Sequence, residues 1–213
     1  MSRTAIVAGA TGLVGEALLR QLSAQRDYTQ IRVLGRRPPK HESGSIKFVF
    51  TDFSNLDTLS ADLAVDEVYC CLGTTQRKAG SAAAFERVDF HMVVDLARAA
   101  KKAGAKKFLV VSAAGASLKS PAFYSRVKAR MEQAVSEAGF EAVHILRPSL
   151  LLGPRQELRP AEKLFQLLAP LYSPFLVGPL RRYRPTRAED VAAAMLTLAQ
   201  GKATGAKVHH LPL

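Results

Sequence analysis

Cysteine is scarce in this chain of 213 residues: there are two, and they are neighbours, Cys70 and Cys71. A disulfide between adjacent residues would be strained, so the chain has no disulfide framework of the kind that holds small secreted proteins together. The histidines, such as His91 and His144, have no partner at metal-ligand spacing. The sequence therefore indicates a reducing compartment and no metal site.

Long hydrophobic runs are also missing. The longest apolar stretch without a charge covers residues 167–180, which is too short to span a bilayer and is interrupted by prolines, so we expect it to pack within the fold. The first residues pass directly into an apolar strand pattern, without the basic region, apolar core and cleavage site of a secretory signal. We expect a cytoplasmic protein without an integral membrane segment.

Acidic residues are few, with 18 Asp and Glu against 30 Lys and Arg, which gives a net charge of +12. Such a charge favours polyanion binding, but the basic residues are dispersed as pairs, such as Lys101-Lys102 and Lys106-Lys107. No basic arm and no basic stripe with interleaved aromatics is present. This pattern disfavours nucleic-acid binding and favours a solvated surface with one site for an anionic small molecule.

Apolar runs of strand length alternate with helical patterns up to about residue 150. The runs are continuous, which is typical of strands buried on both faces of a parallel sheet. The predicted strands cover 4–9, 30–35, 46–50, 67–72, 107–112 and 142–147, and the predicted helices cover 12–25, 84–104 and 123–139. We therefore predict an α/β fold of the Rossmann type, a doubly wound parallel sheet with helices on both faces and right-handed crossovers.

The pattern loosens after Leu150. Residues 151–187 are rich in proline and predict a small irregular extension on the substrate side, followed by a helix at 188–200 and a short strand near 208–212. With 48% hydrophobic residues and no linker, we expect residues 1–213 to form one NAD(P)-binding domain.

A glycine-rich loop, GATGLVG, follows the first predicted strand. Gly9 permits a tight turn, Gly12 lets the backbone approach a pyrophosphate, and Gly15 lets the helix lie close to the sheet. The unpaired N–H groups at the helix N-terminus suit the phosphates. The spacing departs from G-x-G-x-x-G, but the strand–turn–helix context favours dinucleotide binding over a structural loop. Further expected contacts in this loop are Thr11, Leu13 and Val14.

The end of the second predicted strand points to the form of the cofactor. Proteins that prefer NAD place Asp or Glu there to bind the ribose 2′-hydroxyl, but this sequence has Arg36 and Arg37. Two guanidinium groups suit a 2′-phosphate by charge and by bidentate geometry, so we predict NADP, preferred as NADPH over NADH. An exposed basic turn is the alternative. The remaining expected contacts follow the third strand, at the adenine edge, and the fourth strand: Asp52, Phe53, Cys71, Leu72, Gly73 and Thr74.

Tyr124 and Lys128 are four residues apart, so both side chains lie on one face of the helix predicted from residue 123. A neighbouring ammonium stabilises a phenolate, which lets a tyrosine exchange a proton, and the lysine can also hold the nicotinamide ribose. Ser112, at the carboxyl end of the fifth predicted strand, is expected to orient a substrate carbonyl or hydroxyl, with Ser117 as the reserve candidate. One turn of a solvated basic helix is the alternative for the pair.

The motifs GATGLVG, VVS, YSRVK and LRPSLLLGP, in this order, resemble the short-chain dehydrogenase/reductase superfamily in its extended or atypical form. Residues 70–80 and 146–163 are similar, more narrowly, to the branch named after the Tat-interacting-protein oxidoreductase. The resemblance spans nearly the whole chain. It implies a Rossmann fold, NADPH held by the glycine loop and the basic turn, and a catalytic dyad of Tyr124 and Lys128. It also implies that Pro148, Ser149 and Leu150 run beside the nicotinamide.

Two further features of the sequence bear on the candidate site. Where the superfamily often has an asparagine that helps a proton relay, this chain has Asp89, whose charge does not suit a standard relay although it can bind water. Farther along the chain, Arg155 or Arg159 could attract an anionic substrate group or a cofactor phosphate. The alternative for these two arginines is helix-end and surface charge.

The sequence thus favours an NADPH-dependent oxidoreductase that reduces a carbonyl-like small-molecule acceptor. The alternative is an NADPH-sensing regulatory protein, with little or no turnover, whose cofactor occupancy sets an interaction with a protein partner. An epimerase or isomerase that retains its cofactor is a third reading, which is disfavoured because no nucleotide-sugar element is apparent. The acceptor and the oligomeric state stay open.

Overall fold

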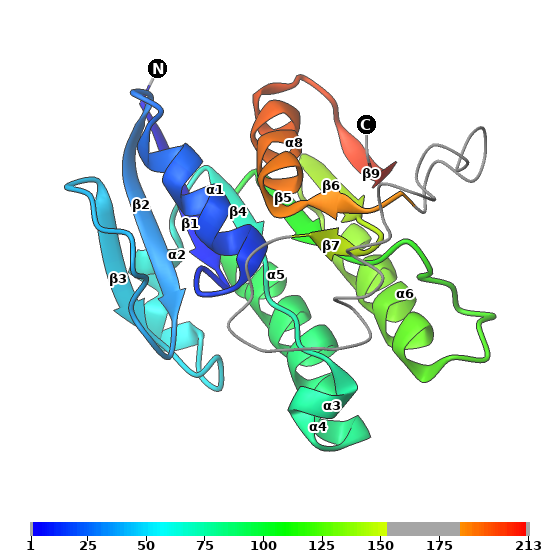
Figure 1. Cartoon of the computed structure of the whole chain (residues 1–213). Coiled ribbons are helices and arrows are strands. Elements are labelled where there is room, and N and C mark those ends of the chain that lie inside the picture. The colour runs from blue at the N-terminus through cyan, green and yellow to red at the C-terminus, as the bar shows by residue number, and fades with distance from the viewer. Residues whose placement is uncertain (1, 153–183, 212–213) are drawn as a thin grey trace.

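The protein, seen in a computed structural model that describes residues 2–152 and 184–211, is built on a seven-stranded sheet (Figure 1). The strand order is β3-β2-β1-β4-β5-β6-β9, and every neighbouring pair is parallel. The strands are β1 Arg3–Ala8, β2 Tyr28–Gly35, β3 Ile46–Phe50, β4 Glu67–Cys70, β5 Lys107–Val111, β6 Ala142–Arg147 and β9 Gly205–His210. The predicted Rossmann-type fold is confirmed.

Helices cover both faces of this sheet (Figure 1). On one face α1 packs beside α8, and on the other face lie α2, α5 and α6. The helical elements are α1 Leu13–Ser23, the 3₁₀ turn η1 Asp57–Leu59, α2 Ser60–Leu63, α3 Gln76–Ala79, α4 Ala82–Glu86, the π-helical turn η2 Arg87–His91, α5 Met92–Lys102, α6 Phe123–Ser136 and α8 Ala188–Gln200. A small separate pair joins β7 (Leu151–Leu152) to β8 (Thr186–Arg187).

The continuous apolar strands fill a core on each side of the sheet. Alternate residues of one strand face opposite layers, so that Ile6 packs toward α5 while Val7 packs toward α1 and α8. Both residues are fully buried. Because neither face of the central strands meets water, the sequence reads as unbroken apolar runs instead of an alternation.

Residues 84–104, predicted as one α-helix, form three consecutive pieces, and the prediction is wrong in this respect. The turn η2 separates α4 from α5, and a π-helical turn is wider than an α-helical one. Its central residue, Asp89, is fully buried and pairs with a lysine of another helix. The apolar periodicity of the sequence gives no sign of this turn. The turn is accompanied by the ion pair of Asp89 with Lys128, and local spacing does not encode a contact between residues so far apart in the chain.

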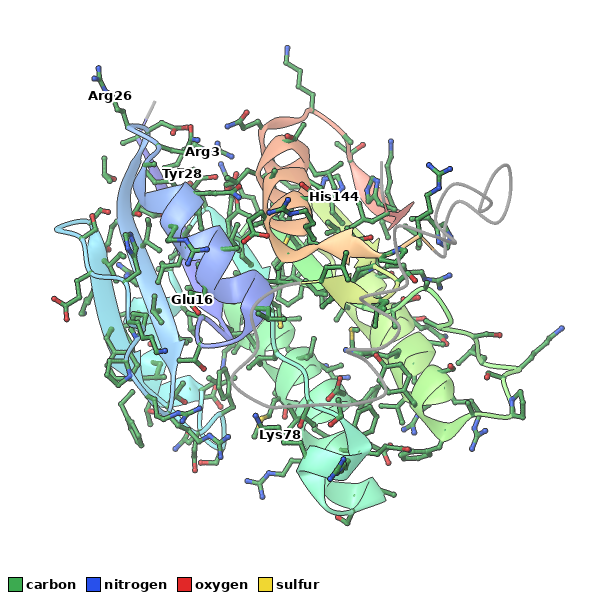
Figure 2. The ribbon with its side chains drawn as sticks, in the orientation of Figure 1. Arg3, Glu16, Arg26, Tyr28, Lys78 and His144 are labelled. Carbon is green, nitrogen blue, oxygen red and sulfur yellow. The ribbon has the colours of Figure 1, made fainter. Side chains whose placement is uncertain are left out.

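The amino ends of the central strands carry a buried polar cluster that lies away from the candidate site. Arg3 forms an ion pair with Glu67, whose carboxylate accepts hydrogen bonds from Tyr28 (2.6 Å) and Tyr69 (2.9 Å). Figure 2 shows Arg3 and Tyr28 together at this end. Burial, followed by the Glu67 charge, raises the pKa of both tyrosines, so they stay neutral. This cluster fixes the ends of β1, β2 and β4.

The second edge strand, β9, pairs with β6 and begins a few residues earlier than the strand predicted near 208–212. His144 of β6 and His209 of β9 are joined by a ring-nitrogen contact of 3.0 Å. Burial lowers the pKa of His144 to about 4, so this contact joins two neutral rings near neutral pH. In the part of the chain that the structure describes, no helix is both long and apolar enough to span a membrane.

Candidate active site

The glycine loop lies at the carboxyl edge of the sheet, where β1 ends and the strand order reverses between β1 and β4. Gly9 has φ +83°, and a side chain there would place its Cβ 2.5 Å from the carbonyl oxygen of Cys71. At Gly15 a Cβ would lie 2.2 Å from the carbonyl oxygen of Gly9. The two glycines therefore let the loop close against the segment after β4 and let α1 start at the sheet.

Gly12 differs from its two neighbours in the motif. It is the N-cap residue of α1, it is exposed, and no side chain caps the helix there. Among the described residues, a Cβ on Gly12 would meet only the carbonyl oxygen of Gly9, at 3.4 Å. In the part of the chain that the structure describes, no side chain caps this helix N-terminus, which Thr11, Leu13 and the buried Val14 surround and which suits a negatively charged group. These residues fit the pyrophosphate of a dinucleotide.

The basic turn lies beside this loop. The register of β1 and β2 pairs Ala8 with Leu34, so Gly9 and Gly35 follow at the same level of the sheet. Arg36 and Arg37 come next, and both are exposed. The described geometry therefore brings two guanidinium groups and the helix N-terminus to one edge, where a phosphorylated ribose can meet them.

The residues expected near the adenine form a tight turn after β3. The Asp52 carboxylate accepts hydrogen bonds from the backbone and the hydroxyl of Ser54, which lowers the pKa of that carboxyl. Phe53 has φ +66°, an unusual conformation for a residue with a side chain, and its ring is buried. This turn is held by its own contacts, which keeps it in place at the sheet edge.

Tyr124 and Lys128 lie on the buried face of α6, as the spacing predicts. The Lys128 ammonium is 2.8 Å from Asp89 Oδ1 and donates to the carbonyl oxygen of Val111 at 3.5 Å. The Tyr124 ring packs on Phe85 of α4, with 5.4 Å between ring centroids. The lysine is therefore not a solvated charge of a basic helix, because it is held against the carboxyl end of β5.

The charges around Tyr124 act in opposite directions. Burial raises the pKa of the phenol, the Lys128 charge lowers it, and the Asp89 charge raises it again, so the net direction is upward. Burial alone would lower the pKa of Lys128, but the charge and hydrogen bond of Asp89, together with the charges of Tyr124 and Cys70, raise it, and the net direction is upward. The dyad therefore rests as a neutral phenol beside a charged ammonium.

Asp89 also fixes the segment after β4. Its Oδ2 atom accepts a hydrogen bond from the backbone N–H of Thr74 at 2.8 Å. A Cβ on Gly73 would lie 3.5 Å from the Asp89 carboxylate and 3.8 Å from the Lys128 ammonium. The residues expected to pass close to the cofactor, from Cys71 to Thr74, are thus placed by the same carboxylate that holds the lysine.

Ser112 makes a contact that the sequence did not predict. Its hydroxyl donates to Glu132 Oε1 at 2.5 Å, and Arg147 of β6 binds the same carboxylate through two nitrogens, at 2.9 and 2.5 Å. Glu132 follows Lys128 by one further turn of α6, so Tyr124, Lys128 and Glu132 form one stripe. That i, i+4, i+8 spacing was the available sequence signal, and we did not predict a role for Glu132 or Arg147.

The other predicted residues occupy different places. Ser117 is exposed, its hydroxyl accepts from the backbone N–H of Lys119, and its own N–H donates to the carbonyl oxygen of Ser125 in α6. The segment of Pro148, Ser149 and Leu150 leaves β6 and is tied to the loop after β5, because Ala114 N–H donates to the carbonyl oxygen of Pro148. Arg155, Arg159 and the apolar stretch 167–180 lie outside the described residues.

The fold and this edge define the class of protein: a Rossmann-type domain with a dinucleotide loop and a tyrosine–lysine pair at the carboxyl end of its sheet. A family model described as the NAD dependent epimerase/dehydratase family matches residues 5–211. The chain belongs to this family. It is an NAD(P)-binding, oxidoreductase-type protein related to the short-chain dehydrogenases.

Named relatives confirm the narrower resemblance to the Tat-interacting-protein branch. The protein HTATIP2 of Rattus norvegicus is 36% identical over 165 residues, which cover 76% of this chain and 68% of that protein. The protein "fmp52, mitochondrial" of Emericella nidulans is 35% identical over 176 residues, covering 79% of this chain and 75% of that protein. The second name places that relative in mitochondria, so the compartment of this chain stays a prediction.

Solved structures agree with the fold. MoeE5 in complex with UDP-glucuronic acid and NAD superposes with a TM-score of 0.75 at 20% identity, covering 97% of this chain and 75% of that one. The Bordetella bronchiseptica enzyme WbmH in complex with NAD+ gives a TM-score of 0.72 at 16% identity, covering 99% and 76%. At these identities the similarity concerns the fold alone.

Substitution of the loop glycines should separate folding from cofactor binding. Gly12→Ala should keep wild-type stability, because its Cβ has room in the protein, yet weaken dinucleotide binding about tenfold or more, or about 1.4 kcal/mol. Gly15→Ala should destabilise the fold on the order of 3 kcal/mol through its clash with Gly9. Thermal denaturation and cofactor titration measure the two effects.

Gly44→Ala is the matched control, since no atom of the described residues lies within 4 Å of the added Cβ, and it should change neither property. Equal dinucleotide affinity in Gly12→Ala and the wild type would contradict the placement of the pyrophosphate on this loop.

Proposed function

We propose that this protein is an NADPH-dependent oxidoreductase that reduces a carbonyl-like acceptor. The observation that carries the proposal is the position of Lys128, buried at the carboxyl end of β5 beside Tyr124. A solvated basic helix would leave this ammonium in water. Taking both Lys128 and its partner Asp89 out of water costs free energy that their attraction need not repay, so stability alone does not explain this arrangement.

The described residues suggest how the cofactor is held. The pyrophosphate fits the open N-terminus of α1 at Gly12, and Arg36, with Arg37 behind it, supplies the cation for a 2′-phosphate. The Asp52–Phe53 turn borders the adenine, and Lys128 faces the nicotinamide ribose. When bound, the cofactor supplies the hydride for the reduction.

Tyr124 is the proton donor in this proposal. Its raised pKa keeps the phenol protonated near neutral pH, so it carries the proton that the oxygen of the acceptor needs. Lys128 stays charged and stabilises the phenolate that remains after the proton has left. The chain's own contribution to the chemistry is therefore a positioned proton and a fixed charge.

Ser112 orients the acceptor, and its bond to Glu132 sets the direction of its hydrogen bonds. While its hydroxyl donates to Glu132, its lone pairs can accept from a product hydroxyl. To donate to a carbonyl oxygen, the hydroxyl must first leave Glu132. The Arg147 ion pair holds Glu132 in place for this exchange.

The same contacts support the second candidate, an NADPH-sensing regulatory protein with little turnover. The Lys128 charge is offset by Asp89, and the Ser112 hydroxyl is bound by Glu132, so both groups are engaged before any ligand binds. In that role, cofactor occupancy would set an interaction with a protein partner. Turnover distinguishes the two candidates.

Cofactor preference follows from the basic turn. NADPH should bind at least tenfold more tightly than NADH, and Arg36→Ala should remove most of this preference, because a charged hydrogen bond contributes about 1.5–3 kcal/mol. Titration of the purified protein, followed by the fluorescence of the reduced nicotinamide, measures both affinities. Arg26→Ala is the matched control, since Arg26 lies at the opposite end of β2 (Figure 2) and should not affect binding. Equal affinities for NADPH and NADH would contradict the assignment.

The proton donor is tested by Tyr124→Phe, which keeps the ring that packs on Phe85 but removes the hydroxyl. With a panel of aldehydes and ketones, the loss of NADPH absorbance should slow about 10²-fold or more, while NADPH affinity stays near that of the wild type. Unchanged turnover in this variant would refute the role of Tyr124. A wild-type protein that binds NADPH but reduces no member of the panel would favour the regulatory candidate.

A further inference from the structure

One helical segment contacts both members of the tyrosine–lysine dyad. It runs from α4 through η2 into α5, with Phe85 packed on the Tyr124 ring and Asp89 bound to the Lys128 ammonium. The π-helical turn itself carries Asp89, and Phe85 lies just before it in α4. Because such a turn is wider than an α-helical one, it changes which side chains of the segment face α6.

The ion pair between Asp89 and Lys128 is almost fully enclosed. The two side chains are 1% and 5% exposed, and their charged atoms are 2.8 Å apart. The second carboxylate oxygen is engaged as well, by the backbone N–H of Thr74. Asp89 therefore has no freedom to act as a solvated base, and its two oxygens hold two different parts of the site.

We propose that Asp89 is a positioning residue: it holds the Lys128 ammonium at the end of β5 and offsets part of the lysine's charge at the Tyr124 phenol. The effect of Asp89 on catalysis rests on the proposed function, whereas the balance of charge among Tyr124, Lys128 and Asp89 does not depend on it. With an aspartate at position 89, the neutral Tyr124 phenol lies beside one cation, Lys128, and one anion, Asp89. The three groups together carry no net charge.

No other described group near the dyad changes this balance. On β4, burial raises the pKa of the Cys70 thiol to about 12, so it stays neutral. On the buried face of α6, Glu132 is the next charged residue after Lys128, and its carboxylate is held by Arg147. On α4, Glu86 is paired with Arg130 toward solvent. The carboxylate that faces both Tyr124 and Lys128 is that of Asp89.

As a consequence, the Tyr124 phenol gives up its proton less easily than it would with an uncharged residue at position 89. Removal of the carboxylate takes away the negative charge that opposes the phenolate, and the forming phenolate itself helps to keep Lys128 charged, so ionisation of Tyr124 is favoured. Asp89→Asn should therefore increase the ionised fraction of Tyr124 about tenfold at a given pH, which moves its midpoint down by about one pH unit.

Ultraviolet absorbance of tyrosinate measures this directly, and the absence of tryptophan from the chain leaves the signal clean. The signal of Tyr124 is the difference between a protein and its Tyr124→Phe counterpart, recorded for the wild type and for Asp89→Asn. The comparison covers the pH range in which circular dichroism shows an intact fold. The method needs neither cofactor nor substrate.

Glu86→Gln is the matched control, because it removes the same charge one turn earlier in the same segment, from a pair with Arg130 of α6. It should leave the Tyr124 signal unchanged. If Asp89→Asn does not fold, Asp89→Ser also removes the charge and can still accept from the Thr74 N–H. The same downward shift is expected in that variant.

A Tyr124 midpoint that stays unchanged or rises in the folded Asp89 variant would overturn the inference. A downward shift in that variant alone, with none in Glu86→Gln, supports it. Because the titration is done without ligand, this result is independent of the NADPH measurement: failure to bind NADPH would refute the proposed function and leave the charge balance standing.

Discussion

The ion pair between Asp89 and Lys128 is the interaction on which the candidate site depends. It joins η2 to α6, and the second oxygen of Asp89 adds the segment after β4, so three separate parts of the chain meet at one carboxylate. Loss of one partner of a buried pair leaves an uncompensated charge and costs about 3–5 kcal/mol. A pair of apolar side chains at positions 89 and 128 would hold η2 and α6 together equally well. The presence of two charges here is therefore explained by a role in the site more readily than by the stability of the fold.

The sheet separates this site from the structural polar cluster at its other end. The apolar cores on both faces fill the middle of each strand, and polar side chains gather where the strands begin and where they end. At the amino ends, Arg3, Tyr28, Glu67 and Tyr69 satisfy one another and leave no open position. At the carboxyl ends, Gly12 is exposed and no described side chain caps the N-terminus of α1. A ligand site therefore belongs to the carboxyl edge.

Much of this arrangement could be predicted from local sequence. The strands, the glycine loop and the shared face of Tyr124 and Lys128 follow from periodicity and short spacing, which act within a few residues. The π-helical turn and the partners of Asp89 and Ser112 could not be predicted in this way. Ser112 and Glu132, for example, are 20 residues apart and meet because β5 and α6 pack together. Such pairs depend on tertiary packing, and a single sequence gives only the residue types that could form them.

The central claim is that one cofactor spans the glycine loop, the basic turn and the tyrosine–lysine dyad. A crystal structure of the protein with NADP+ tests it most directly. The account predicts the pyrophosphate at Gly12, the 2′-phosphate within hydrogen-bond distance of Arg36, and the nicotinamide ribose within hydrogen-bond distance of Lys128 or Tyr124. A nicotinamide that lies away from α6 would contradict the account, since Tyr124 and Lys128 could then take no part in its chemistry.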